Sequence, residues 1–239
     1  MGLRLGPVTK DQLKRFGNSW EQGQHVFVSG PTGSGKTTLA RQIVEQRIAR
    51  GGHVIVMVAK PVVDPTILKE YRGWTRWTRM RKRGVAPSDK RILLWPKVEG
   101  KPASEALPIQ REVFAEAFDI LSMVGHWTVQ VDEGLYNCNP MFLNLAQPLA
   151  MGLNIGRSSN LTYVTLTQRP SHLPLVCYSS ASHAFVGQHR EMSDLKRSAA
   201  MDGINSKEIT RMVSGQGRRD FLWLPIAPGW ESESVHLTR

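Results

Sequence analysis

Cysteine and long apolar segments are scarce in this sequence. Its 239 residues include only two cysteines, Cys138 and Cys177, outside any Cys-x-x-Cys pair, so neither a disulfide framework nor a thiolate metal site is indicated. The histidines show no metal-ligand spacing, and neither a run of about 18 apolar residues nor a secretory signal occurs. We expect a cytoplasmic protein with buried free thiols and no direct membrane insertion.

Acidic residues are also in short supply. The chain has 20 Asp and Glu against 31 Lys and Arg, which gives a formal net charge of +11. Such an excess indicates a polyanionic partner, either nucleic acid or an anionic membrane surface. A generally basic surface without a partner is the alternative. The hydrophobic (41%) and charged (21%) contents are those of a globular protein with a substantial core.

Apolar β-branched runs alternate with helical patterns along the chain. The sequence predicts helices at 36–50 and 109–123, a β-hairpin within 221–237, and strands at 25–29, 53–59, 91–95, 127–131, 161–166 and 183–187. This order predicts an α/β fold with a mainly parallel sheet and a C-terminal β-hairpin. We expect a single domain over residues 1–239, with residues 60–110 as a basic insertion or surface region.

A glycine-rich segment, GPTGSGKT, follows the first strand and precedes a helix. It fits the phosphate-loop pattern G-x-x-x-x-G-K-[ST], in which backbone N–H groups surround phosphate oxygens at a helix amino terminus. Lys36 is expected to reach the β- and γ-phosphates of ATP, and Thr37 to ligate Mg²⁺. A glycine-rich turn that binds nothing is the alternative. The predicted nucleotide-binding residues are Gly30, Pro31, Thr32, Gly33, Ser34, Gly35, Lys36, Thr37 and Thr38.

Two acidic residues, Asp132 and Glu133, end the apolar strand at 127–131. An acid at the end of a buried strand is costly unless it has a function. In P-loop enzymes the Asp at this place holds Mg²⁺, and an adjacent Glu can take the proton of the attacking water, which indicates NTP hydrolysis. The alternative is that both acids only begin a helix. In the additional-strand type of P-loop fold, the strand at 161–166 would lie between the two motifs.

The strand at 161–166 ends in the segment TLTQRPS, with the uncharged Gln168. Because the carboxyl ends of parallel strands open onto one crevice, Gln168 would lie beside the γ-phosphate. Its amide can donate to a phosphate oxygen and accept from the attacking water. Gln168 is therefore predicted to sense the γ-phosphate, with a simple polar strand end as the alternative.

Together, GPTGSGKT, VQVDE and TLTQRPS resemble the FtsK–HerA family of DNA-pumping ATPases. The segment MVSGQGRRDFLWLP is similar to the Gly-rich stretch and hairpin near the end of that ATPase domain, so the resemblance covers roughly residues 25–225. It implies a RecA-like core of the additional-strand (ASCE) type. It also implies a ring of subunits that moves DNA through its centre by Mg²⁺-dependent ATP hydrolysis.

Some members of this family carry a membrane-spanning region, a winged-helix DNA reader or an amino-terminal barrel, none of which is recognised here. The resemblance therefore favours a viral genome-packaging ATPase, a pentameric or hexameric ring on double-stranded DNA that docks on a portal or capsid protein. Such a protein works in the host cytoplasm and associates transiently with the capsid. The alternatives are a DNA pump for conjugation or plasmid transfer, and a nucleotide-switch assembly factor that does not pump.

A ring motor of this kind needs a cation from the neighbouring subunit to stabilise charge in the transition state. The resemblance implies Arg157, just before the strand at 161–166, in this role. Arg169 and Arg190 are the alternatives.

The segment KEYRGWTRWTRMRKRG is densely basic. Helical spacing would place Arg72, Arg76, Arg79 and Arg83 on one face, which could contact a DNA backbone or an acidic portal partner. A solvated face without a partner is the alternative. The intervening tryptophans are expected to pack against the core, because duplex DNA offers no free bases for stacking. Residues 215–219, GQGRR, are a second basic candidate for DNA contact.

Overall fold

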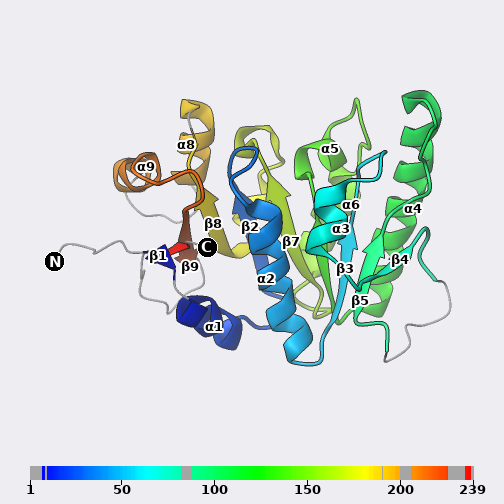
Figure 1. The fold of residues 1–239 in the computed structure, drawn as a ribbon, viewed down its shortest axis with the longest axis horizontal. Coiled ribbons are helices and arrows are strands. Elements are labelled where there is room, and N and C mark those ends of the chain that lie inside the picture. Colours follow the sequence, from blue (N-terminus) through cyan, green and yellow to red (C-terminus); the bar gives the residue numbers. More distant parts are fainter. Residues whose placement is uncertain are drawn as a thin grey trace.

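One sheet runs through the whole protein (Figure 1). The computed structural model describes residues 7–8, 10–81, 88–189, 191–199, 206–225 and 235–237. Within them, ten strands follow the spatial order β1-β10-β9-β8-β2-β7-β6-β3-β5-β4. From β8 to β4 every neighbouring pair is parallel, whereas β9 pairs antiparallel with both β8 and β10. The predicted α/β fold with a mainly parallel sheet and an antiparallel C-terminal pair is confirmed.

The strands predicted from the sequence are all present, to within two residues at each end. The strands are β1 Pro7–Val8, β2 His25–Ser29, β3 His53–Met57, β4 Thr75–Trp77, β5 Arg91–Leu94, β6 Trp127–Val131, β7 Thr162–Thr167, β8 Ala181–Gly187, β9 Phe221–Pro225 and β10 Val235–Leu237. The helices are α1 Lys10–Ser19, α2 Lys36–Ala49, α3 Pro65–Glu70, α4 Ala103–Val124, α5 Gly134–Cys138, α6 Ala146–Ile155, α7 Val176–Ser179, α8 Met192–Ala199 and α9 Ser206–Ser214, with a 3-10 turn at Pro170–His172.

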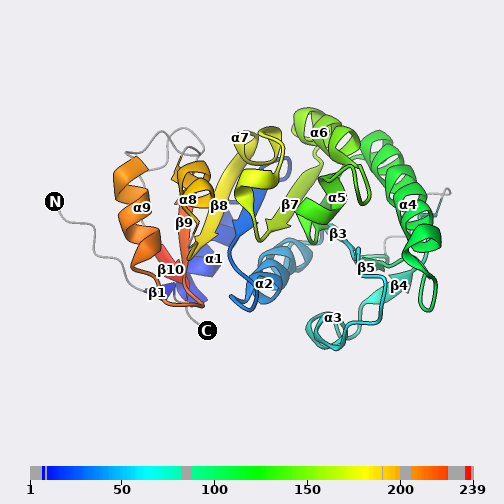
Figure 2. The same ribbon diagram turned by 90° about the horizontal axis from the view of Figure 1, so that it is seen from above.

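Helices cover both faces of the sheet (Figure 2). Helices α1, α2 and α3 lie on one face, and α4, α5, α6 and α7 lie on the other. The central strands are buried along almost their whole length, as parallel strands between two helix layers must be. Their side chains alternate between two cores, so that Val26 packs with Ile43 of α2 and Tyr163 packs with Phe118 of α4.

Strand β7 lies between β2 and β6, as expected for the additional-strand type of P-loop fold. Leu166 of β7 is in register with Val28 of β2, and Thr165 is in register with Val131 of β6. The carboxyl ends of these parallel strands therefore meet at one edge of the sheet, which we call the carboxyl edge. The residues that follow β2, β3, β6 and β7 all lie there.

The helix predicted at 109–123 is longer than expected. It begins at Ala103 and contains Pro108 in its second turn. A proline so close to the amino terminus removes only one intrahelical hydrogen bond, which the apolar face of the remaining helix offsets.

The single helix predicted through the basic stretch at 69–83 is wrong. Helix α3 ends at Glu70, Gly73 takes a φ of 84°, and residues 75–77 form β4, which pairs with β5. Trp77 is buried in one core and Trp74 packs against the other, so both tryptophans pack inwards as predicted. Burial of these rings decides the local conformation against the helical spacing of the arginines.

The arginines of this stretch consequently share no helical face. Arg76 lies in β4, Arg72 precedes it and Arg79 follows it. Arg83 lies outside the described residues.

Cys138 and Cys177 are free and buried, as predicted. Within the described ranges, no helix combines the length and the apolar character that a membrane span requires.

Candidate nucleotide site

The phosphate loop joins β2 to α2 at the carboxyl edge. Gly33 and Gly35 take φ angles of 75° and 95°, a region that only glycine adopts without strain, and α2 begins directly afterwards at Lys36. The Gly30 N–H donates to the Thr167 carbonyl of β7 at 3.2 Å, which fixes the start of the loop. The predicted strand, loop and helix thus occur in the order that phosphate binding requires.

Lys36 folds back onto this loop, and its ammonium group contacts the loop backbone. The side chain is largely buried, and its Nζ donates to the Pro31 carbonyl at 2.9 Å. Burial lowers the pKa of Lys36, against the opposing charges of Glu133 and Asp132. A phosphate group in the loop would replace the carbonyl as a partner and supply the negative charge that a buried ammonium needs.

Asp132 ends β6 in a buried position, with 4% of its surface exposed. Burial raises the pKa of its carboxyl to about 6, and the charge of Glu133 adds to the effect. A carboxylate buried in this way fits a divalent cation, because hard cations prefer oxygen ligands and compensate the charge. Thr37 lines the same pocket as Asp132, so the two residues predicted to hold Mg²⁺ border one pocket.

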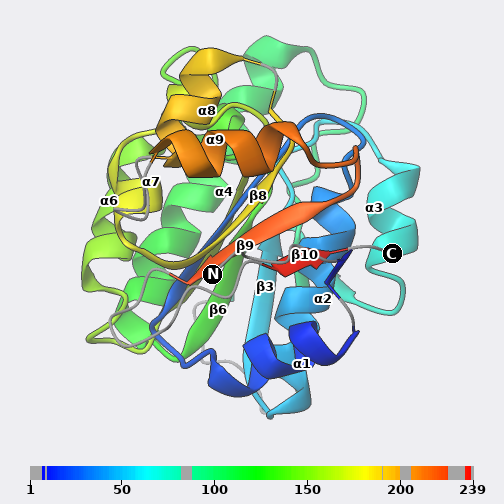
Figure 3. The ribbon, with the colours of Figure 1, turned by 90° about the vertical axis from the view of Figure 1, so that its left-hand side faces the viewer.

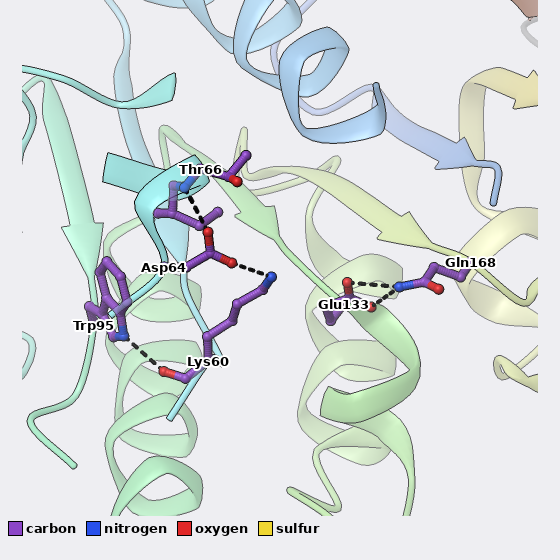
Figure 4. Close-up of polar contacts among 7 residues, drawn as sticks. Lys60, Asp64, Thr66, Trp95, Glu133 and Gln168 are labelled. Carbon is purple, nitrogen blue, oxygen red and sulfur yellow. Dashed lines mark hydrogen bonds and ion pairs between the residues drawn. The ribbon is translucent and has the colours of Figure 1, made fainter. Parts of the chain in front are cut away.

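A series of hydrogen bonds links the loop to the second acid. Gln168 Nε2 donates to both carboxylate oxygens of Glu133, at 3.0 and 3.2 Å (Figure 4). The Thr32 hydroxyl donates to Gln168 Oε1 at 2.6 Å. The three predicted site residues therefore form one continuous chain from the phosphate loop across β7 to β6.

Glu133 is held where a helix begins, but it does not cap that helix. It precedes α5 with a left-handed φ of 53° and makes no side-chain capping bond. Asn137 Nδ2 donates to the Asp132 and Glu133 carbonyls at 2.8 and 3.1 Å, which stabilises the turn. Glu133 thus contacts Gln168 from a backbone conformation that is costly for a non-glycine residue.

One side of the pocket comes from residues that sequence reasoning missed. Lys60, which follows β3, forms an ion pair with Asp64 at 2.5 Å, and Asp64 accepts from the Thr66 N–H at 2.7 Å to cap α3 (Figure 4). On the same side, Glu70 accepts from the Thr38 hydroxyl at 2.8 Å. A sequence signal exists for this side, since the charged residues Lys60 and Asp64 follow an apolar strand, as Asp132 and Gln168 follow theirs.

The candidate arginines lie in different places. Arg157 precedes β7, at the opposite end of the strand from Gln168, and its backbone packs beside Gly23 ahead of β2. Arg169 forms ion pairs with Asp194 at 2.8 Å and Glu191 at 3.5 Å on the same chain. Arg190 lies outside the described residues.

Comparison with solved structures gives the same fold. The genome packaging NTPase B204 from Sulfolobus turreted icosahedral virus 2, in complex with sulfate, has a TM-score of 0.61 at 14% identity, over 92% of this chain and 98% of that one. Its complex with ATP-gammaS has a TM-score of 0.55 at 15% identity, over 85% and 93%. VirB4 of Thermoanaerobacter pseudethanolicus has a TM-score of 0.65 at 10% identity, over 90% and 88%. The pCW3 conjugation coupling protein TcpA has a TM-score of 0.50 at 15% identity, over 90% and 60%.

Sequence comparison adds little to this. No protein-family model matches the chain. The ATP-dependent DNA helicase dda of Enterobacteria phage T4 is 40% identical over 53 residues, which are 22% of this chain and 12% of the helicase. The likeness to the solved structures shows that the chain has the RecA-like P-loop NTPase fold that B204 and VirB4 share. The resemblance drawn from the motifs is thus confirmed at the level of the fold.

Proposed function

We propose that this chain, as one ATPase domain over residues 1–239, is an ATP-driven translocase of double-stranded DNA in a viral genome-packaging motor. The observation that carries the proposal is the series of hydrogen bonds from Thr32 through Gln168 to Glu133. These bonds couple the phosphate loop to a general base for water. The likeness to B204 and the net charge of +11 support DNA as the partner.

Each side chain has a defined part in this reaction. Glu133 accepts the proton of the attacking water, and Lys36 neutralises charge on the β- and γ-phosphates. Bound between Thr37 and Asp132, Mg²⁺ would supply further neutralisation of the phosphates. When a γ-phosphate occupies the loop, Gln168 Nε2 donates to a phosphate oxygen in place of the Glu133 carboxylate, and this frees Glu133.

The motor acts as a pentameric or hexameric ring. Arg157 lies at the far end of β7 from its own phosphate loop, so it serves the site of the neighbouring subunit if it serves any. The ring docks on a portal or capsid protein, and the basic surface holds the DNA backbone without sequence preference.

The test is ATP hydrolysis by the purified protein with and without long double-stranded DNA, at two salt concentrations. We expect DNA to raise turnover and added salt to weaken the stimulation, because backbone contacts depend on counterion release. Equal turnover with and without DNA would remove the translocase proposal.

Two other functions make different predictions. A conjugation or plasmid-transfer pump, favoured by the likeness to TcpA, would also be stimulated by DNA but would need a membrane partner for docking. A nucleotide-switch assembly factor would bind ATP and show no stimulation by DNA. Pull-down with a portal protein or with a membrane-embedded partner separates the packaging motor from the conjugation pump.

A further inference from the structure

The turn between α9 and β9 lies against the phosphate loop, although the two are nearly 200 positions apart in the chain. In Figure 3 the chain leaves α9 and enters β9 beside the loop that precedes α2. A Cβ atom placed on Gly33 would lie 2.8 Å from Nη2 of Arg218. Arg219, the next residue, lines the same pocket as Lys36 and Thr37.

The position of this turn follows from the sheet. Phe221, the first residue of β9, is in register with Gly187 of β8, and β8 pairs with β2. The buried Phe221 ring packs on the backbone of Gly30 and Gly187, where an added Cβ would approach it to 3.4 and 3.1 Å. The first residue of β9 therefore lies in contact with the first residue of the phosphate loop.

The turn itself is internally braced. The Gly217 N–H donates to Oδ2 of Asp220 at 2.9 Å, and the Asp220 N–H donates to the Gly217 carbonyl at 3.1 Å. The only acid within the turn is thus used to close it. Arg218 and Arg219 are exposed, and neither forms an ion pair within the described part of the chain.

Other cations at or near this pocket already form ion pairs. Lys60 lines the pocket and pairs with Asp64, and Arg41 pairs with the pocket residue Glu70 at 3.2 Å. The polyphosphate of a nucleotide carries several negative charges. Of the residues predicted to bind the nucleotide, only Lys36 is positively charged. Two guanidinium groups beside the phosphate loop supply further positive charge. Arginine suits this role because it binds phosphate oxygens through paired N–H groups.

We propose that Arg218 and Arg219 form an arginine clamp of the same subunit on the β- and γ-phosphates of the bound nucleotide, in place of the DNA contact suggested by their sequence. This inference rests on the nucleotide site proposed above and extends it. The clamp also connects the nucleotide to α9 and β9, which carry no other part of the site.

The experiment measures equilibrium binding of fluorescent ATPγS, ADP and AMP to the full chain, without DNA. The variants are Arg218→Ala and Arg219→Ala, and the matched control is Arg211→Ala, an exposed arginine on α9. Each clamp variant should lose about tenfold in affinity for ATPγS, less for ADP and none for AMP, since a charge-assisted hydrogen bond is lost. The control should bind all three nucleotides as the wild type does.

Melting temperatures without nucleotide check that each variant is folded, and they should match the wild type because both side chains are exposed. Unchanged ATPγS affinity in both clamp variants would overturn the proposal. So would an equal loss in Arg211→Ala, or a loss confined to binding of double-stranded DNA measured in parallel. If the wild type binds ATPγS but DNA does not stimulate its turnover, the translocase proposal fails and the clamp result stands independently.

Discussion

The arginines around β4 and the charged groups at the carboxyl edge are arranged in opposite ways. Around β4, Arg76 pairs with Glu99, and Arg79 pairs with Glu112 and Glu116. Arg81 adds an ion pair with Asp89 and stacks over Trp77. These cations are matched within the chain, and exposed pairs of this kind contribute little to stability or binding.

At the carboxyl edge, by contrast, three charged groups lack an ion-pair partner within the part of the chain that the structure describes, although Lys60 and Asp64 are paired there. Asp132 is buried without a cation in contact among the described ion pairs, Lys36 donates to a neutral carbonyl, and Glu133 is bonded to a neutral amide. The densest basic stretch in the sequence is therefore not the best marker of a ligand site. Charged groups that the fold holds without a counter-charge mark the site better.

The largest effect on ATP turnover should come from removing the carboxylate of Glu133, the second of the two acids that follow β6. Glu133→Gln should reduce turnover at least about a hundredfold, because the general base is lost, while ATP binding is kept. Steady-state hydrolysis and fluorescent-nucleotide binding measure the two effects. Glu112→Gln is the matched control from the paired region and should keep full turnover; substantial activity in Glu133→Gln would remove Glu133 from the base role.

A smaller effect, of opposite sign on stability, should follow from neutralising Asp132. Its folded pKa of about 6 lies above the unfolded value of 3.8, so the folded chain carries a buried charge at a cost above pH 6. Asp132→Asn should therefore raise the free energy of unfolding by about 3 kcal/mol at neutral pH, or roughly 6–12 °C in melting temperature.

The stability gain in Asp132→Asn should depend on pH. Protonation relieves the cost as pH falls from about 6 towards about 4, so the gain in Asp132→Asn should vanish there. Thermal unfolding in a chelating buffer at both pH values measures it. Asp119→Asn, on an exposed acid of α4, should change neither value. A gain that is equal at both pH values would show that charge burial is not the cause.

Thr32 allows a finer test of the carboxyl edge. Thr32→Val removes the hydroxyl that donates to Gln168 and should lower kcat about threefold to tenfold, with KM nearly unchanged. Thr32→Ser keeps the hydroxyl and should retain wild-type kcat. Equal kcat values in the Val and Ser variants would show that the hydrogen bond to Gln168 does not position the base.

The smallest effect is expected in the paired region. Arg79→Ala should lower the free energy of unfolding only slightly, because the two ion pairs that are lost are exposed and screened by solvent. DNA binding should keep its salt dependence. A decrease of about one in the slope of log affinity against log salt would show that Arg79 contacts a phosphate after all.

The amino-acid sequence is sufficient where local order and parallel topology determine the outcome. The phosphate loop is a local motif, and parallel strands must end at one edge, so the proximity of Asp132, Glu133 and Gln168 follows from the sequence alone. The order with β7 between β2 and β6 is likewise expected from the fold type.

Two features could not be predicted from the sequence because they depend on the pairing of strands that are distant in the chain. Strand β4 forms because Trp77 is buried and residues 75–77 pair with β5, contacts that helical spacing cannot reveal. The proximity of Arg218 to Gly33 depends on the register of β9 with β8, which the pattern of residues 221–225 does not specify.

The contact of Phe221 with Gly187 has a consequence for genetics. A methyl group at Gly187 would be too close to its neighbours unless they moved by a few tenths of an ångström, since a Cβ would lie 3.1 Å from both the Phe221 ring and the Ser29 carbonyl. In a saturation screen scored by function, substitutions at Gly187 should be as damaging as those in the phosphate loop, although the residue has no polar side chain. A map of intolerant positions would then extend the apparent motif by a glycine about 150 residues downstream of it.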